Sequence, residues 1–140
     1  MKMELKIYRR QKPKVYAKPS TVRLCHLNRK DEYIAFNVCA INEIGMTQGQ
    51  RILFAQDTAT NAWFFTVGAA DDLTEGNKLR LQKTGDRVTS LRCQNKEVVS
   101  AILDKSDYES ATYHIAKNPQ RQDGREWYRI LTTTPFRAKQ

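Results

Sequence analysis

Alternating hydrophobic and polar positions in the first half of the chain predict strands on both sides of one short helix. Residues 22–27 and 33–36 alternate as half-buried strands do, and a polar, turn-like segment separates them. Asn37 is a suitable helix N-cap, and the apolar stripe after it ends at Gly45, a typical helix stop. Two further hydrophobic runs predict strands over residues 51–55 and 63–67.

The same order of patterns recurs in the second half of the chain. Asn95 would cap a second helix as Asn37 caps the first, and Trp127 corresponds to Trp63. The elements around this helix are a strand at 79–81, a turn at 84–86 and strands at 88–93, 111–116 and 127–131. We therefore predict an α+β fold made of two ββαββ pseudo-repeats, with largely antiparallel pairing and two short helices.

The duplication predicts one compact domain in five segments, because neither repeat has enough core to fold alone. The alternative is a chance likeness between two halves of an α+β chain. The expected segments are a basic N-terminal arm or edge strand (1–19), the first repeat (20–67), an acidic linker (68–76), the second repeat (77–132) and a C-terminal tail (133–140).

Charge is distributed unevenly along the 140 residues, which carry 24 Lys and Arg against 15 Asp and Glu, a net charge of +9. Residues 1–30 hold ten basic side chains and one acidic one, whereas residues 31–76 have a net charge of −6. Residues 77–116 have a net charge of +2, and residues 117–140 have a net charge of +4. Prolines oppose a helix in the N-terminal arm, so we expect an extended basic segment that favours polyanionic partners.

Part of the first half resembles a known DNA-binding unit. Residues 34–37 lead into the predicted helix, residues 44–46 read Ile-Gly-Met, and Gly49-Gln50 precedes a strand. This stretch resembles the half-unit of AbrB/MazE-type swapped-hairpin DNA-binding proteins, in which a strand enters a short helix ending in Leu-Gly-Ile before Gly-Asp and another strand. The strand order alone is similar to that of Whirly-type and Pur-repeat single-strand binders. Both resemblances imply nucleic-acid binding.

Motifs for catalysis are missing from the sequence, which has no Gly-x-Ser-x-Gly, no phosphate-binding Gly loop and no His-Glu-x-x-His. Cys25 and His26 are adjacent in a strand and so point to opposite faces, which disfavours a Cys-His dyad. The acidic residues at 71, 72 and 75 do not have calcium-loop spacing. We expect a non-enzymatic protein with no catalytic residue, metal, cofactor or small-molecule substrate.

Three cysteines without a Cys-x-x-Cys motif disfavour a disulfide framework or a zinc knuckle. The mean hydropathy is −0.67, and the sequence contains neither a membrane-span run nor a signal-peptide pattern. We expect a cytoplasmic protein with no membrane partner, and leave a homo-oligomer open.

Outward cations are the main candidates for function. Leucines beside Arg23 and Arg80 face the core, so both arginines should project from the opposite face as a matched pair. Phe64 and Tyr128 each follow a tryptophan and are either base-stacking or core residues. The full candidate set is Arg9, Arg10, Lys12, Lys14, Lys18, Arg23, Arg29, Lys30, Arg80, Lys83, Arg87, Phe64 and Tyr128. The predicted function is binding of DNA or RNA through the phosphates. The alternative is an assembly protein whose basic arm docks on an acidic surface.

Overall fold

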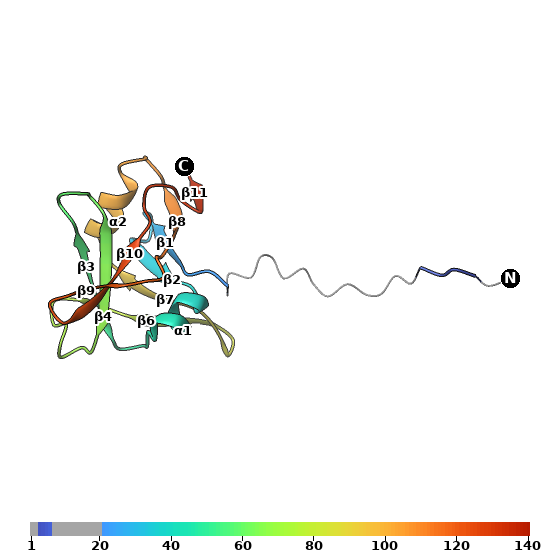
Figure 1. The fold of residues 1–140 in the computed structure, drawn as a ribbon, viewed down its shortest axis with the longest axis horizontal. Helices are drawn as coiled ribbons and strands as arrows, with labels where there is room; N and C mark the ends of the chain where they lie inside the picture. The colour runs from blue at the N-terminus through green and yellow to red at the C-terminus, as the bar shows by residue number, and fades with distance from the viewer. Residues whose placement is uncertain (1–2, 7–20) are drawn as a thin grey trace.

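The computed structural model describes residues 3–6 and 21–140, and within these residues the chain forms two α-helices and eleven β-strands (Figure 1). The helices are α1 (Val38–Ile44) and α2 (Lys96–Leu103). The strands are β1 (Leu24–Asn28), β2 (Tyr33–Phe36), β3 (Arg51–Gln56), β4 (Trp63–Gly68), β5 (Asn77–Lys78), β6 (Arg80–Thr84), β7 (Arg87–Gln94), β8 (Ser110–His114), β9 (Gln120–Gln122), β10 (Arg125–Ile130) and β11 (Arg137–Lys139).

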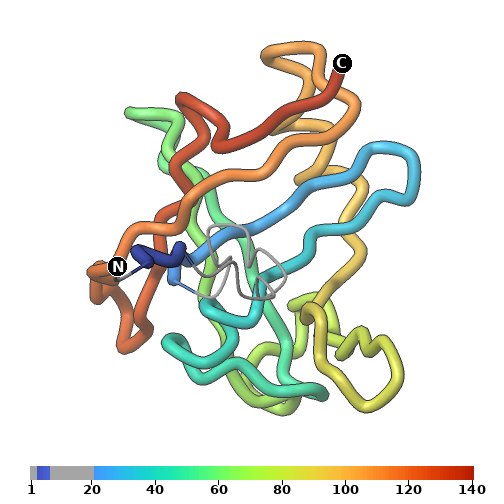
Figure 2. Tube along the Cα trace, turned by 90° about the vertical axis from the view of Figure 1, so that its right-hand side faces the viewer, coloured from blue at the N-terminus to red at the C-terminus, as the bar shows by residue number. Residues whose placement is uncertain are grey.

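The strands pair antiparallel in two sheets that pack against each other. Sheet A has the order β11-β8-β1-β2-β7-β6, and sheet B has the order β5-β3-β4-β10-β9. Figure 2 shows sheet A broadside, with the chain crossing the view strand by strand. The inner faces meet at Phe36 of β2 and Phe65 of β4, whose ring centroids lie 5.0 Å apart.

The core fills the space between the sheets, and the two helices lie at opposite ends of it (Figure 1). Helix α2 contributes four buried side chains, and α1 buries Cys39 and Ala40. The largest fully buried side chains are Tyr113, Phe36, Phe65, Leu27, Ile34, Ile52, Leu79, Leu91, Leu103 and Ile130. Burial of this apolar surface is the main stabilising contribution to the fold.

Side-chain caps fix where both helices begin. The Asn37 Oδ1 atom accepts a hydrogen bond from the Ala40 N–H at 3.0 Å, and the Asn95 Oδ1 atom accepts one from the Val98 N–H at 2.9 Å. Gly45 ends α1 with a φ of 80°, a left-handed conformation that glycine adopts at little cost. The predicted helix starts and the predicted stop at Gly45 are confirmed.

The predicted α+β fold class, with its antiparallel sheets and two short helices, is also confirmed. Both halves contain strands, a helix and strands in the predicted order, with β5, β9 and β11 as additions. The third strands of the two halves pair differently, because β3 pairs with its neighbour β4 whereas β8 pairs with β1. A common ancestor unit for the two halves stays a prediction.

Two predicted segments differ from expectation. Residues 133–140 are not a free tail, because β11 adds an edge strand to sheet A and Arg137 pairs with Thr112. The acidic segment 68–76 packs onto the body through Leu73, which is 4% exposed, and through an ion pair between Asp72 and Arg125 of β10 at 3.1 Å. Residues 3–6 are not in a strand, and the rest of the expected arm lies outside the described residues.

Candidate nucleic-acid interface

One row of side chains crosses the whole of sheet A on its outer face. Residues paired across neighbouring strands point to the same side of a sheet, and the alternate positions, such as Cys25 and Leu91, are buried. The row is therefore outward. From one edge of the sheet to the other it consists of Arg80, Arg92, Ala35, His26, Thr112 and Arg137.

The strands of sheet A carry only positive charge. Their sequences contain six Lys and Arg residues and no Asp or Glu, whereas sheet B contains Glu126. By the strand pairing, Arg80, Arg92, Arg137 and Lys139 point outward, and we call this set the basic face. An anion that approaches the basic face meets no carboxylate on these strands.

A groove lies on this surface, and its lining extends from Ser90 of β7 to Arg137 of β11. Its volume is about 400 Å³. Small side chains at the centre of the sheet leave this space open, since Ala35, Ser90 and Thr112 lie between the longer residues. The lining also includes His26 and Arg137.

Arg92 and Tyr33 form a stacked pair beside the groove. The Arg92 guanidinium carbon lies 4.3 Å from the centre of the Tyr33 ring, within the range of a cation–π contact. The ring of His26 lies 6.1 Å from that of Tyr33. The Arg92 Nε atom is buried and has no hydrogen-bond partner in the described part of the chain. The stacking holds the guanidinium over Tyr33, on the outward side of sheet A.

His26 is the titratable group at the centre of the row. Its Nδ1 atom lies 2.8 Å from the Thr112 hydroxyl oxygen, within hydrogen-bond distance. Burial and the positive charge of Arg137 lower the pKa of His26 below its ordinary value of 6.5. The imidazole is therefore uncharged at neutral pH, and an uncharged imidazole can form a hydrogen bond with a ligand either as donor or as acceptor.

The expected pairing of Arg23 with Arg80 is wrong. Arg80 is exposed on the edge strand β6, as predicted. The Arg23 side chain is only 13% exposed and forms an ion pair with Glu43 at 2.6 Å. It also donates hydrogen bonds to the carbonyl oxygens of Ala116 and Lys117. These internal bonds occupy the Arg23 guanidinium, so it is not available as an outward partner for Arg80.

The turn between β1 and β2 and the turn between β6 and β7 do not lie on one shared surface. Antiparallel pairing of β2 with β7 places Tyr33 beside Gln94 and Phe36 beside Leu91. The β1–β2 turn with Lys30 therefore lies at one end of sheet A, and the β6–β7 turn lies at the other end (Figure 2). Lys83 and Arg87 are exposed there. Arg29 is not free, because it pairs with Asp104 and donates to the Tyr108 carbonyl oxygen.

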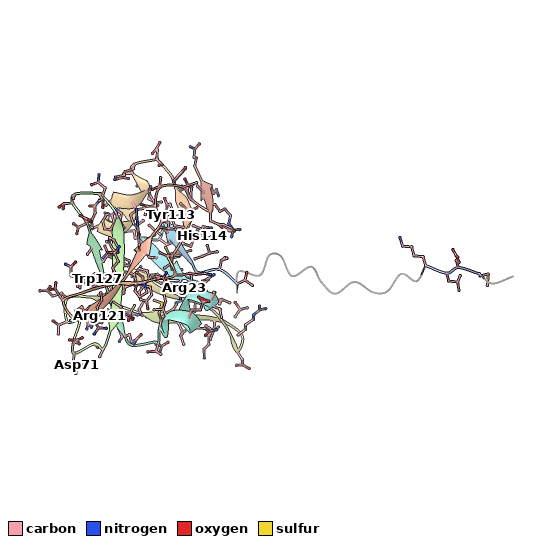
Figure 3. The ribbon with its side chains drawn as sticks, in the orientation of Figure 1. Arg23, Asp71, Tyr113, His114, Arg121 and Trp127 are labelled. Atoms are coloured by element: carbon pink, nitrogen blue, oxygen red, sulfur yellow. The ribbon has the colours of Figure 1, made fainter. Side chains whose placement is uncertain are left out.

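The two aromatic candidates lie on opposite sides of sheet B. Tyr128 faces the core, where its ring stacks on Phe65 at 5.6 Å. Phe64 is half-buried on the outer face, in a recess that it shares with Trp127. Trp127 was predicted to correspond to Trp63. This prediction is wrong, because Trp63 faces the core whereas Trp127 lies on the outer face of sheet B. Figure 3 shows Trp127 and Arg121 on the β9–β10 side of the molecule, away from the sheet A strands.

Several residues of the basic face were missed from the sequence. The alternation in β7 was a usable signal, since Arg92 lies between the core residues Leu91 and Cys93. Arg137 and Lys139 were missed because residues 133–140 were expected to be a tail. The arm cations Arg9, Arg10, Lys12, Lys14 and Lys18 lie outside the described residues.

The cysteines and acids of the described residues do not form a reactive or metal site. Burial raises the pKa values of Cys25 and Cys93, the latter to about 12, so both are unreactive thiols at neutral pH. Among residues 3–6 and 21–140 no cluster of His, Cys, Asp and Glu could hold a metal ion. Neither helix in the described chain has the length and apolar character needed to cross a bilayer.

Comparison with protein-family models, with curated proteins and with solved structures found no significant match to this chain.

Proposed function

We propose that this protein binds nucleic acid through the outer face of sheet A, with the basic face contacting phosphates. The observation that carries the proposal is the combination of six basic residues and no acidic one in these six strands. Phosphate contacts by Lys and Arg release counterions, which supplies most of the sequence-independent affinity for nucleic acid.

The spacing of the cations favours an extended polyanion over a small one. Arg80 and Arg137 are on opposite edge strands of sheet A, five strand intervals apart. At about 4.8 Å per interval, their Cα atoms are separated by roughly 24 Å across the sheet. A single phosphate cannot bridge that distance, whereas a chain of phosphates can contact both edges.

The N-terminal arm would add affinity to this surface. It precedes β1, the strand of sheet A that carries His26, and contains the clustered cations between Arg9 and Lys18. Lys30, Lys83 and Arg87 extend the positive charge at the two ends of the sheet. These contacts would be to phosphates and would carry no direct sequence information.

Two double variants with equal charge change test the proposal. Arg80→Gln with Arg137→Gln removes two cations from the basic face, and Arg121→Gln with Arg129→Gln removes two from sheet B. Fluorescence anisotropy of a labelled oligonucleotide would be measured against salt concentration. The first variant should bind more weakly and flatten the log–log salt slope by about 1.4 to 1.8, because each phosphate contact contributes about 0.7 to 0.9.

The sheet B variant is the control and should change the slope far less. Equal losses for both double variants would show that total charge, not this surface, determines binding. A wild-type protein that retains no oligonucleotide at about 50 mM salt would remove the proposal altogether.

A further inference from the structure

We infer that the nucleic acid recognised by this surface is an unpaired strand that crosses sheet A, with a base in the groove over Ala35, His26 and Thr112. This inference rests on the proposed function and names its substrate class. It is argued from the groove and from the Arg92–Tyr33 pair beside it, because neither feature is required for binding phosphates by charge alone.

The width of the sheet argues against readout of an intact duplex. Sheet A has six strands and is roughly 24 Å wide, whereas the major groove of B-form DNA is about 12 Å wide and admits two strands. The sheet groove spans the strands from β7 through β2, β1 and β8 to β11. Side chains there cannot reach base edges inside a duplex, so only an unpaired base can enter the groove.

The contents of the groove suit a base. Its volume of about 400 Å³ is within the range of small-ligand sites, roughly 300 to 1,000 Å³. Its lining includes the polar groups of Ser90, Thr112 and His26, of which the last two are within hydrogen-bond distance of each other. Arg92, which is paired with Ala35 of the groove lining, provides planar groups beside the groove, because its guanidinium carbon lies 4.3 Å from the centre of the Tyr33 ring. Aromatic and guanidinium planes are the surfaces on which unpaired bases stack.

The cations are positioned to hold the phosphates on both sides of that base. Arg80 and Arg92 are paired on β6 and β7 at one side of the groove, and Arg137 and Lys139 lie on β11 at the other. The Cα atoms of Arg92 and Arg137 are four strand intervals apart, about 19 Å. At the stacked spacing of about 3.4 Å, this distance corresponds to about six nucleotides.

Two substitutions separate base contacts from phosphate contacts, because neither removes a charge. Ala35→Ile fills the groove with a side chain that strands accept well, and Tyr33→Leu removes the ring beside Arg92. Trp127→Leu on the outer face of sheet B is the matched control, since it also removes a half-buried aromatic ring. Circular dichroism and thermal unfolding would verify that each variant is folded.

Anisotropy titrations would compare a 12-nucleotide single strand, as DNA and as RNA, with the blunt DNA duplex of the same sequence. The wild type should bind one or both single strands at least about tenfold more tightly than the duplex. Tyr33→Leu should weaken single-strand binding by about 5- to 160-fold, the value of one stacked base, because it removes the ring that holds the Arg92 guanidinium as a stacking plane. Ala35→Ile should weaken it by about tenfold or more. Ala35→Ile should keep the wild-type salt slope and duplex affinity, because it leaves every cation of the basic face in place, and Trp127→Leu should match the wild type.

Equal affinity for the single strand and the duplex would overturn this inference and leave the proposed function standing. Unchanged single-strand affinity in Ala35→Ile and Tyr33→Leu would do the same. Failure of the wild type to bind any of the three oligonucleotides would instead refute the proposed function. These outcomes distinguish an error in the substrate class from an error in the function.

Discussion

The direction of each side chain decides whether it can take part in the interface. The alternation rule placed Arg80 on the exposed side of its strand, and the same rule applied to β7 would have found Arg92. It failed for Arg23, which lies just before β1 and turns back to Glu43 and to the carbonyl oxygen of Ala116. Those partners are 20 and 93 positions away in sequence, so local periodicity contains no information about them.

The pKa of His26 should depend on the positive charge of Arg137. The Arg137 cation contributes to the lowered pKa of His26, after burial, so Arg137→Gln should raise that pKa towards 6.5. The folded-state pKa is below the unfolded value, so the free energy of unfolding decreases as the pH falls from about 6.5. The variant should lose less stability on acidification. An NMR titration of the His26 ring would measure the shift. An unchanged or lower pKa would contradict the electrostatic effect of Arg137 on His26.

Secondary structure was predictable where a pattern extended over four or more residues. The strands β2, β3 and β4 and both helix starts match the expectation to within one residue. The missed strands β5, β9 and β11 contain only two or three residues each, too few for alternation to be recognised. Strands β5 and β11 form because a neighbouring strand offers free backbone groups at a sheet edge, which is a tertiary effect. Strand β9 instead pairs with β10 through the two-residue turn Asp123-Gly124, a local hairpin signal.

The side chains of the two N-cap residues form different numbers of hydrogen bonds, so their removal should lower the free energy of unfolding by different amounts. The Asn37 amide also accepts from the Leu24 N–H and donates to the Val22 carbonyl oxygen, so it ties α1 to the start of β1. Asn95 donates to Asn77 of β5. Asn37→Ala should lower the free energy of unfolding by about 2 kcal/mol and Asn95→Ala by about 1 kcal/mol. Urea unfolding would measure both, and a larger loss for Asn95→Ala would contradict this order.

The arrangement of the whole molecule could not be read from the repeats. Both halves supply strands of similar pattern, and local sequence does not state that β8 pairs with β1 or that β2 pairs with β7. Together with the pairing of β1 with β2, these pairings put Arg92, Ala35, His26 and Thr112 in one row. They also separate the strands of sheet A, which contain no acidic residue, from those of sheet B, which contain Glu126 on the same side of β10 as Tyr128.

The most direct test of the account is a ¹H–¹⁵N NMR titration of the full chain with an unlabelled single-stranded oligonucleotide. Binding at the basic face predicts that the perturbed amides concentrate in β6, β7, β2, β1, β8 and β11, and that Arg92, His26 and Thr112 are among them. Perturbations concentrated in β3, β4, β10 and β9 of sheet B would contradict the account.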